Sequence, residues 1–261
     1  MFKSLWDYRH FIFSSIKNDL LTRFLRSKFG ALWVILNPLS QVLIFALILS
    51  NIMCARIEGL DSNFSFSIYL LAGMLAWNLF FEIVMRSTTL ILDNANALKK
   101  INFPKITMPV IMLGSCVVNN IFLFLSIVVI FFLMGHGFNF SLLGLIPLAF
   151  TIIILAFGIG LIVGILNVFI RDIGQVVPIF LQVMFWLTPI VYPANIIPEK
   201  YAGYLYFNPM TPIVEGYHTI LLYGKMPDFS EVSVVFIMAC LLTALGLFMF
   251  RKASPEMVDV L

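Results

Sequence analysis

The chain has 261 residues, of which 61% are hydrophobic and only 11% carry a charged side chain, and its mean hydropathy is +1.03. Soluble domains contain about 25% charged residues, so the composition excludes an ordinary soluble protein and indicates a chain that is solvated mainly by lipid. The net charge of +3 is small, and because no basic patch is interleaved with aromatic residues, we expect no nucleic-acid partner.

The first predicted element, residues 1–30, is an amphipathic helix on the cytoplasmic face of the membrane. Its apolar positions recur at mostly helical spacing, and charged residues occupy the rest of its surface. Arg26 and Lys28 then precede a long apolar run, and Gly30 permits a bend from an in-plane helix into a crossing one. The alternative interpretation is an ordinary positively charged flank.

Six apolar runs follow, which approach the roughly 20 residues that a helix needs to cross the hydrocarbon core. The fold class is therefore all-α integral membrane, with one transmembrane domain over residues 1–261 and short re-entrant or interfacial outer helices before the last span. The six predicted transmembrane helices are residues 32–53, 68–84, 108–134, 142–170, 176–191 and 232–250.

The Lys and Arg positions orient these spans, because cytoplasmic loops are enriched in both residue types. With six spans, thirteen of the sixteen Lys and Arg residues fall on the side that holds both termini. Only Arg56, Lys200 and Lys225 fall on the other side. We therefore expect both termini in the cytoplasm, since moving one span would scramble this partition.

No cofactor or metal site is predicted on this chain. It lacks the G-x-x-x-x-G-K-[ST] loop that binds nucleotide phosphates, so energy from ATP would have to come from elsewhere. The three cysteines and three histidines are scattered and show no zinc spacing. Glu82 is the one serious acidic candidate within a span, and an i,i+4 ion pair with Arg86 is favoured over a translocation role.

The fourth span carries Ala156, Gly160 and Gly164 at four-residue spacing, followed by Asn167. Small residues on one stripe permit close packing of helices. Static packing is the favoured interpretation, and a moving interface is the functional alternative.

Residues 86–107 are predicted to form a cytoplasmic loop, for which a coupling role is one of two interpretations. Within and just after this loop, the segment NANALKKINFPKITMP combines cations with apolar residues, and Pro104 and Pro109 limit any helix to a short piece. The residues alone leave two interpretations open, a docking element and a plain connecting loop.

Residues 192–231 are predicted to form an outer segment. Thr211 can cap a helix with Pro212 at its first position, and Gly224 can terminate it. This helix is too short to span, so we expect it to be interfacial or re-entrant. The tyrosines upstream suit a boundary between water and apolar groups, and an interfacial aromatic belt is the simpler alternative.

Four motifs in order resemble one family. RSKFGALWVILNPL, NANALKKINFPKITMP, NVFIRDIGQVVP and NPMTPIVEGYHTILLYGKMP resemble, respectively, the N-terminal signature, the first cytoplasmic loop, the Arg-Asp turn between spans four and five, and the outer segment of type-2 ABC-exporter permeases. These permeases move O-antigen, capsule or teichoic-acid polysaccharides, and the Wzm-type O-antigen permeases are the most similar group.

The resemblance implies a homodimeric permease in the bacterial inner membrane, bound to two copies of a separate ATPase subunit that binds ATP and Mg. The cargo would be a polysaccharide on a polyprenyl diphosphate lipid, with O-antigen expected and capsule or teichoic acid as alternatives. The permease itself would not be an enzyme. Besides its cargo and the ATPase, membrane lipid is its expected partner.

The resemblance also implies roles for particular residues. The coupling residues that would transmit movement of the ATPase are Leu98, Lys99, Lys100, Phe103 and Pro104. The outer gate candidates are Ile196, Tyr201, Tyr204, Thr211 and Tyr217. Because aromatic rings can contact the C–H faces of sugars, the expected substrate-channel residues are Trp77, Phe81, Phe185, Trp186 and Tyr192. Arg171 and Asp172 are expected to brace their turn through local hydrogen bonds and a charge pair.

Two other classes of function remain open from the sequence. The first is a membrane scaffold that recruits a cytoplasmic enzyme without transporting anything. The second is a membrane enzyme that acts on a lipid-linked sugar, in which Glu82 or Asp172 would have to be catalytic.

Overall fold

The computed structural model describes residues 6–25, 36, 40, 65–95, 106–133, 137, 139–198, 200, 203, 205 and 207–260. Over these residues the chain is helical and contains no strand. The α-helices are α2 (Arg9–Leu25), α4 (Ser65–Asp93), α6 (Thr107–Leu133), α7 (Leu145–Phe169), α8 (Ile173–Leu187), α10 (Met210–Leu221) and α11 (Phe229–Val260), and the 3-10 helices are η2 (Phe140–Gly144) and η3 (Ala194–Ile196).

Within the described part of the chain, four helices are long and apolar enough to cross a membrane, namely α4, α6, α7 and α11. Helix α8, at the predicted fifth span, has only 15 residues. At 1.5 Å per residue it rises about 22 Å, less than the roughly 30 Å of a hydrocarbon core. The predicted first span, residues 32–53, lies outside the described residues apart from Leu36 and Ser40, so the total of six spans stays a prediction.

Two helices extend well past their predicted ends. Helix α4 continues from Val84 to Asp93, and α11 continues from Phe250 to Val260. A hydropathy pattern detects only the apolar part of a helix, whereas backbone hydrogen bonding continues through polar residues. Residues 86–93, predicted as the start of the coupling loop, are therefore the last turns of α4.

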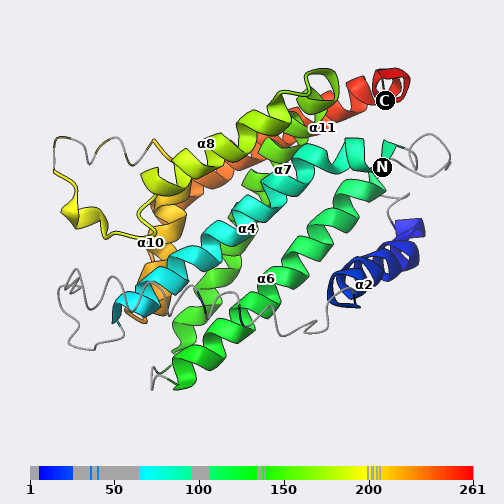
Figure 1. Cartoon of the computed structure of the whole chain (residues 1–261). Helices are drawn as coiled ribbons and strands as arrows, with labels where there is room; N and C mark the ends of the chain where they lie inside the picture. The colour runs from blue at the N-terminus through cyan, green and yellow to red at the C-terminus, as the bar shows by residue number, and fades with distance from the viewer. Residues whose placement is uncertain are drawn as a thin grey trace.

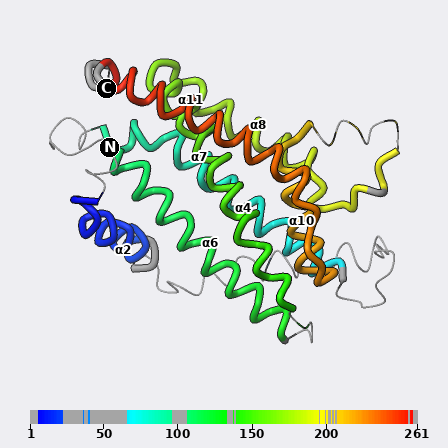
Figure 2. The backbone as a smooth tube through the Cα atoms, turned by 180° about the vertical axis from the view of Figure 1, so that it is seen from behind, coloured from blue at the N-terminus to red at the C-terminus, as the bar shows by residue number. Residues whose placement is uncertain are grey.

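Helix α7 lies between α4 and α11, and glycines bring all three backbones close together (Figures 1 and 2). A Cβ at Gly160 would lie 2.5 Å from the Ser87 side chain, and one at Gly164 would collide with the Ser87 carbonyl oxygen. Near its middle, α7 also approaches α11, because a Cβ at Gly158 would lie 2.6 Å from the Thr243 backbone nitrogen. The predicted close packing of this small-residue stripe is therefore confirmed for both of its glycines.

Helix α2 packs against α6 at the side of this bundle (Figure 1). The contact is close, because a Cβ at Gly114 of α6 would collide with the Ile16 side chain. Large apolar residues also remain exposed on α2, including Phe11 and Phe13. An amphipathic helix over residues 1–30 was predicted, and α2 occupies most of that range.

The short helix α10 belongs to the core, because ten of its twelve residues are buried. It packs against α4 and α7 at the end of the bundle where α4 begins (Figures 1 and 2). Such burial favours a re-entrant position over one on the membrane surface. Three residues after the end of α10, Gly224 adopts a left-handed conformation with φ +63°, which suits its predicted role as a helix terminator.

The predicted cap of α10 was wrong. The helix begins at Met210, so Thr211 and Pro212 lie inside its first turn. The Met210 N–H donates to the side-chain oxygen of Asn208 at 3.0 Å, and this bond starts the helix one residue before the Thr211 position. The buried hydroxyl of Thr211 instead donates to the Leu205 carbonyl oxygen at 2.8 Å.

Candidate functional site

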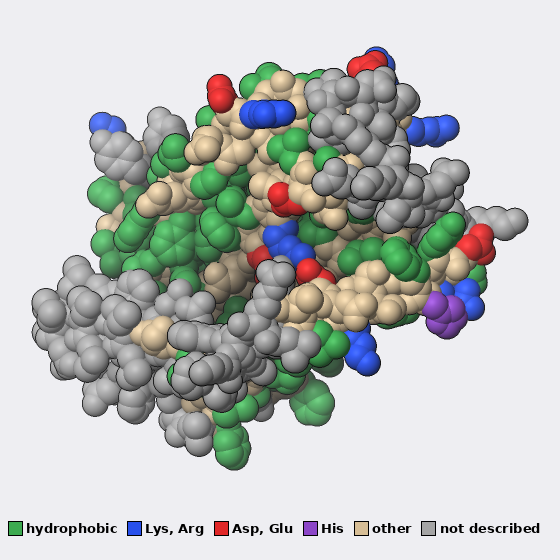
Figure 3. Space-filling model, turned by 45° about the vertical axis from the view of Figure 1, so that its right-hand side comes forward, with side chains coloured by type: hydrophobic (Ala, Val, Ile, Leu, Met, Phe, Trp, Pro, Cys, Tyr) green, Lys and Arg blue, Asp and Glu red, His purple; other side chains and the backbone are tan. Residues whose placement is uncertain are grey.

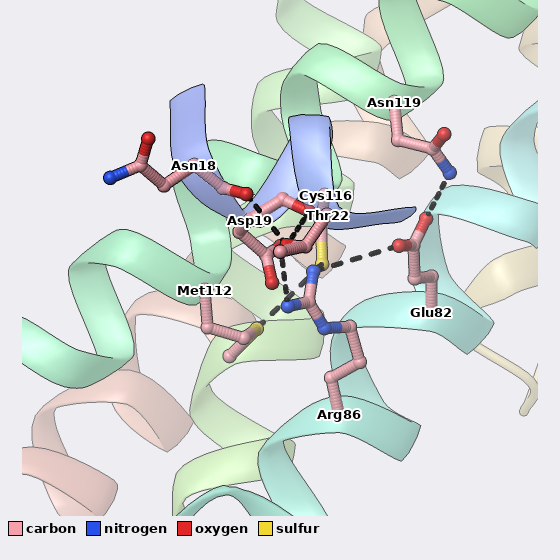
Figure 4. A network of polar contacts seen from close by, with 8 residues as sticks. All are labelled: Asn18, Asp19, Thr22, Glu82, Arg86, Met112, Cys116 and Asn119. Carbon is pink, nitrogen blue, oxygen red and sulfur yellow. Dashed lines mark hydrogen bonds and ion pairs between the residues drawn. The ribbon is translucent and has the colours of Figure 1, made fainter. Parts of the chain in front are cut away.

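A polar network centred on Arg86 joins three helices (Figure 4). One guanidinium nitrogen of Arg86, in α4, donates to the Asp19 carboxylate of α2 at 2.9 Å. The other lies 3.6 Å from the Cys116 sulfur of α6. Glu82, one turn before Arg86, accepts a hydrogen bond of 2.7 Å from the Asn119 amide of α6.

The predicted ion pair between Glu82 and Arg86 is present, at 3.8 Å, but it is longer than the ion pair of the same guanidinium with Asp19. The shorter one, to Asp19, is a contact that sequence reasoning missed, because 67 residues separate the partners and no local spacing connects them. Both side chains of the Asp19 pair are partly buried, with 24% of Arg86 and 33% of Asp19 exposed. Figure 3 shows charged side chains of both signs gathered in the middle of a face that also carries many apolar side chains.

Three of the five predicted channel residues form one connected cluster of aromatic rings, and a fourth is hydrogen-bonded to it. The ring of Trp77 in α4 lies 5.6 Å from that of Phe185 in α8, at an edge-to-face angle of 64°. Phe185 meets Trp186 at 5.6 Å and 81°, and the hydroxyl of Tyr192 donates to the Trp186 carbonyl oxygen at 2.8 Å. Phe81, one turn after Trp77, is 37% exposed and lies outside the described ring contacts.

The cluster runs from the core to the molecular surface. Trp77 is 5% exposed and Phe185 is partly buried, whereas Trp186 is 58% exposed. Edge-to-face pairs are a favourable geometry for aromatic rings, so the buried members hold Trp186 in place while its own ring stays available. The arrangement therefore offers an aromatic surface on a rigid support.

Tyr69 connects the residues after α8 to helices α4 and α10. Its hydroxyl lies 2.9 Å from the carbonyl oxygens of both Pro189 and Tyr192, and can donate to either. Its ring stacks on the buried imidazole of His218, with centroids 3.7 Å apart. Burial lowers the pKa of His218 far below its usual value, so the imidazole is neutral.

The structure separates the predicted outer gate residues. Thr211 and Tyr217 lie in the core, where 0% and 2% of their surfaces are exposed, whereas Ile196 is 68% exposed in η3. Tyr201 and Tyr204 lie outside the described residues. Ile196 is thus the described gate candidate that can reach another molecule without a change of structure.

The turn between α7 and α8 contains Arg171 and Asp172, both exposed. Their backbone carbonyls accept hydrogen bonds from the first turn of α8, and the Asp172 side chain makes no capping hydrogen bond. The side chain of Asn167 stabilises this turn. It is 2% exposed and accepts a 2.8 Å hydrogen bond from the Gly174 N–H. Its role was missed, although a polar residue within an apolar run is a visible signal.

The predicted coupling residues Leu98, Lys99, Lys100, Phe103 and Pro104 lie outside the described residues. Helix α4 ends at Asp93 and α6 begins at Thr107, so the structure places only the two helices that flank them. Among the residues that it describes, no group of three or more His, Cys, Asp or Glu side chains could hold a metal ion.

Comparison with known proteins gives consistent matches over nearly the whole chain. The family described as ABC-2 type transporter matches residues 11–222. The O-antigen export system permease protein RfbA of Klebsiella pneumoniae is 30% identical over 247 residues, which cover 93% of this chain and 92% of that protein. RfbA of Myxococcus xanthus is 28% identical over 254 residues, 91% and 92% of the two chains. The polysialic acid transport protein KpsM of Escherichia coli is 25% identical over 244 residues, 92% of each.

Proposed function

We propose a function for this chain, which belongs to the ABC-2 type transporter family. It is the permease subunit of an ABC exporter that moves a polysaccharide, carried on a polyprenyl diphosphate lipid, across the bacterial inner membrane. Four described helices of spanning length make it an integral membrane protein. O-antigen is the proposed cargo, because two of the compared relatives are named as O-antigen export permeases.

The observation that carries this proposal is the aromatic cluster from Trp77 through Phe185 to Trp186. A sugar polymer presents apolar C–H faces and hydroxyl edges, so aromatic rings can contact it broadly without fixing one sugar in place. Weak, repeated contacts of this kind suit the passage of a polymer. The buried end of the cluster keeps the exposed Trp186 ring in one orientation.

The other components of the proposed transporter are inferred from the family. Because the chain has no phosphate-binding loop of its own, two copies of a separate ATPase, holding ATP and Mg, would supply the energy to a permease homodimer. Leu98, Lys99, Lys100, Phe103 and Pro104 would contact that ATPase, with both termini on the same cytoplasmic side. The outer segment around Ile196 would form the gate on the opposite side.

A second candidate is capsular polysaccharide as cargo, favoured by the similarity to the polysialic acid transport protein KpsM. An enzymatic role has less support. The Glu82 carboxylate already contacts Asn119 and Arg86. The relatives compared with this chain are named as permease or transport proteins.

The proposal is tested in vesicles that contain the permease, its cognate ATPase and a polyprenyl-diphosphate-linked O-antigen. We expect ATP-dependent movement of the polysaccharide across the bilayer, and none when the ATPase is inactive. A capsular polysaccharide tested in parallel decides between the two cargoes. Turnover of the lipid-linked sugar by the permease alone, without movement, would establish the enzymatic alternative.

A further inference from the structure

The buried amide of Asn167 joins three helices at one end of the bundle. Its Nδ2 donates to the Thr88 carbonyl oxygen of α4 at 2.8 Å, and its Oδ1 accepts the Gly174 N–H of α8 at 2.8 Å. Asn167 itself belongs to the last turns of α7. The partners fix the orientation of the amide, since a carbonyl can only accept and an N–H can only donate.

The surrounding backbone is shaped to admit this amide. One turn earlier on α7, Gly164 lets α4 approach so closely that a Cβ there would collide with the Ser87 carbonyl oxygen. On the other side, a Cβ at Gly174 would lie 3.1 Å from Oδ1 of Asn167. The amide therefore occupies a site that fits it on both sides.

The two hydrogen-bond partners of Asn167 belong to helices that lead to different parts of the protein. Thr88 lies five residues before the end of α4, from which the chain continues into the segment proposed to contact the ATPase. Gly174 lies in the first turn of α8, and the far end of α8 carries Phe185 and Trp186. Eleven residues of helix separate Gly174 from Phe185, a rise of about 16 Å.

Helix α8 is therefore held to α4 at both of its ends. Asn167 makes the link at the first turn, and the ring of Phe185 against Trp77 makes it near the last turn. Between them, Pro178 removes one backbone hydrogen bond from α8. A displacement of the end of α4 would thus reach α8 through Asn167 before it reached the aromatic cluster.

We propose that Asn167 is a positioning residue that transmits movement of the end of α4 to α8 and so to the aromatic surface. This inference rests on the proposed export function. Its alternative is a purely structural role, in which the two hydrogen bonds only stabilise the fold. The alternative predicts that variants fold less well but, once folded, export the same amount of polysaccharide for each ATP hydrolysed.

The test compares Asn167→Leu and Asn167→Ala in the full permease with its ATPase in vesicles. Both variants remove the two hydrogen bonds. Leucine keeps the volume of the side chain, whereas alanine leaves a cavity, so an effect that both variants share is caused by loss of the hydrogen bonds. Thr151→Val is the matched control, because the buried Thr151 hydroxyl bonds only within α7, to the Pro147 carbonyl oxygen at 2.9 Å. The measured quantity is polysaccharide exported for each ATP hydrolysed.

We expect both Asn167 variants to hydrolyse ATP at close to the normal rate while export for each ATP falls roughly fivefold, the factor that corresponds to one hydrogen bond of about 1 kcal/mol. Thr151→Val should keep the normal ratio. An unchanged ratio in both folded Asn167 variants would overturn the proposal.

Hydrogen exchange of the purified permease gives a second readout that needs neither ATP nor cargo. Loss of the two Asn167 hydrogen bonds should raise the rate of amide hydrogen exchange both at residues 89–93 of α4 and in the first turn of α8, again roughly fivefold. A rise in α8 alone would show that Asn167 does not link the two helices. If the normal protein exported nothing, the proposed function would fail, and this exchange measurement would still decide whether the link exists.

Discussion

The carboxylate of Asp19 and the guanidinium of Arg86 lie 2.9 Å apart and join the N-terminal helix α2 to the later half of α4. The same guanidinium also reaches Glu82 and Cys116 (Figure 4). A cation held by groups from three helices resists displacement of any one of them. Any force applied to α2 would therefore reach α4 through this pair.

Breaking this pair should destabilise the protein moderately. In a cycle of Asp19→Ala, Arg86→Ala and the double variant, we expect a coupling energy of about 1 kcal/mol, because the pair is partly exposed and so is partly screened by solvent. A charge swap is less informative, since it would place a carboxylate beside Glu82. Thermal unfolding in detergent micelles measures the effect, and strictly additive single variants would show that the pair contributes nothing.

The exposed end of the aromatic cluster should matter for export and little for folding. Because Trp186 is 58% exposed and loses only its ring contact with Phe185, we expect Trp186→Ala to lower the stability by about 0.5–1 kcal/mol. Export should fall roughly fivefold, the loss that corresponds to one aromatic contact of about 1 kcal/mol. Phe180→Ala is the control, because Phe180 is 63% exposed on the same helix outside the cluster. Equal effects of the two variants on export would remove Trp186 from the pathway.

The close contact between α7 and α4 should not tolerate a methyl group. We expect Gly164→Ala to lower the free energy of unfolding by about 1–3 kcal/mol, because its Cβ would collide with the Ser87 carbonyl oxygen. Gly137→Ala is the matched control, since a Cβ there meets nothing within 4 Å. Unfolding midpoints of the two variants give the comparison, and a Gly164→Ala protein as stable as the control would contradict this packing.

The buried His218 should make stability depend on pH. Burial lowers its pKa to about 3 in the folded protein, whereas an unfolded histidine titrates near 6.5. Between these values the unfolded state binds more protons, so stability rises with pH in this window. From about pH 7 to about pH 5 the protein should lose roughly 2 kcal/mol through this group.

The variant that checks this is His218→Phe, which keeps an aromatic ring against Tyr69 but cannot bind a proton. We expect it to flatten the pH dependence of the unfolding midpoint below about pH 6.5. His10→Phe, at an exposed site on α2, should leave the dependence as it was. A normal pH dependence in His218→Phe would assign the effect to other groups.

The gate proposal is best tested at Ile196, because its side chain is 68% exposed whereas Tyr217 is buried. In a background without Cys54, Cys116 and Cys240, we expect Ile196→Cys to crosslink across the two-fold axis of a homodimer and to block export until the crosslink is reduced. Phe248→Cys is the control, because Phe248 lies on α11 and is 65% exposed. Full export with no crosslink at Ile196 would place the gate elsewhere.

Local patterns predicted several helices correctly. The apolar runs in α4, α6, α7 and α11 identified four helices of spanning length, because hydropathy and helix length are properties of consecutive residues. The spacing of Gly160 and Gly164 likewise predicted close packing, since residues four apart share one face of a helix. Four motifs in order also sufficed to indicate the family that the comparisons establish.

The sequence by itself thus determined a helical membrane protein and its family, because these depend on composition, periodicity and short motifs. The tertiary structure decided which side chains from different helices contact one another. Asp19 meets Arg86, and Asn167 meets Thr88 and Gly174, only because of how the helices rotate and cross. It also decided that α10 is buried, since an apolar face does not specify which helices will cover it. Contacts between residues far apart in the chain depend on packing of the whole bundle, which no local pattern records.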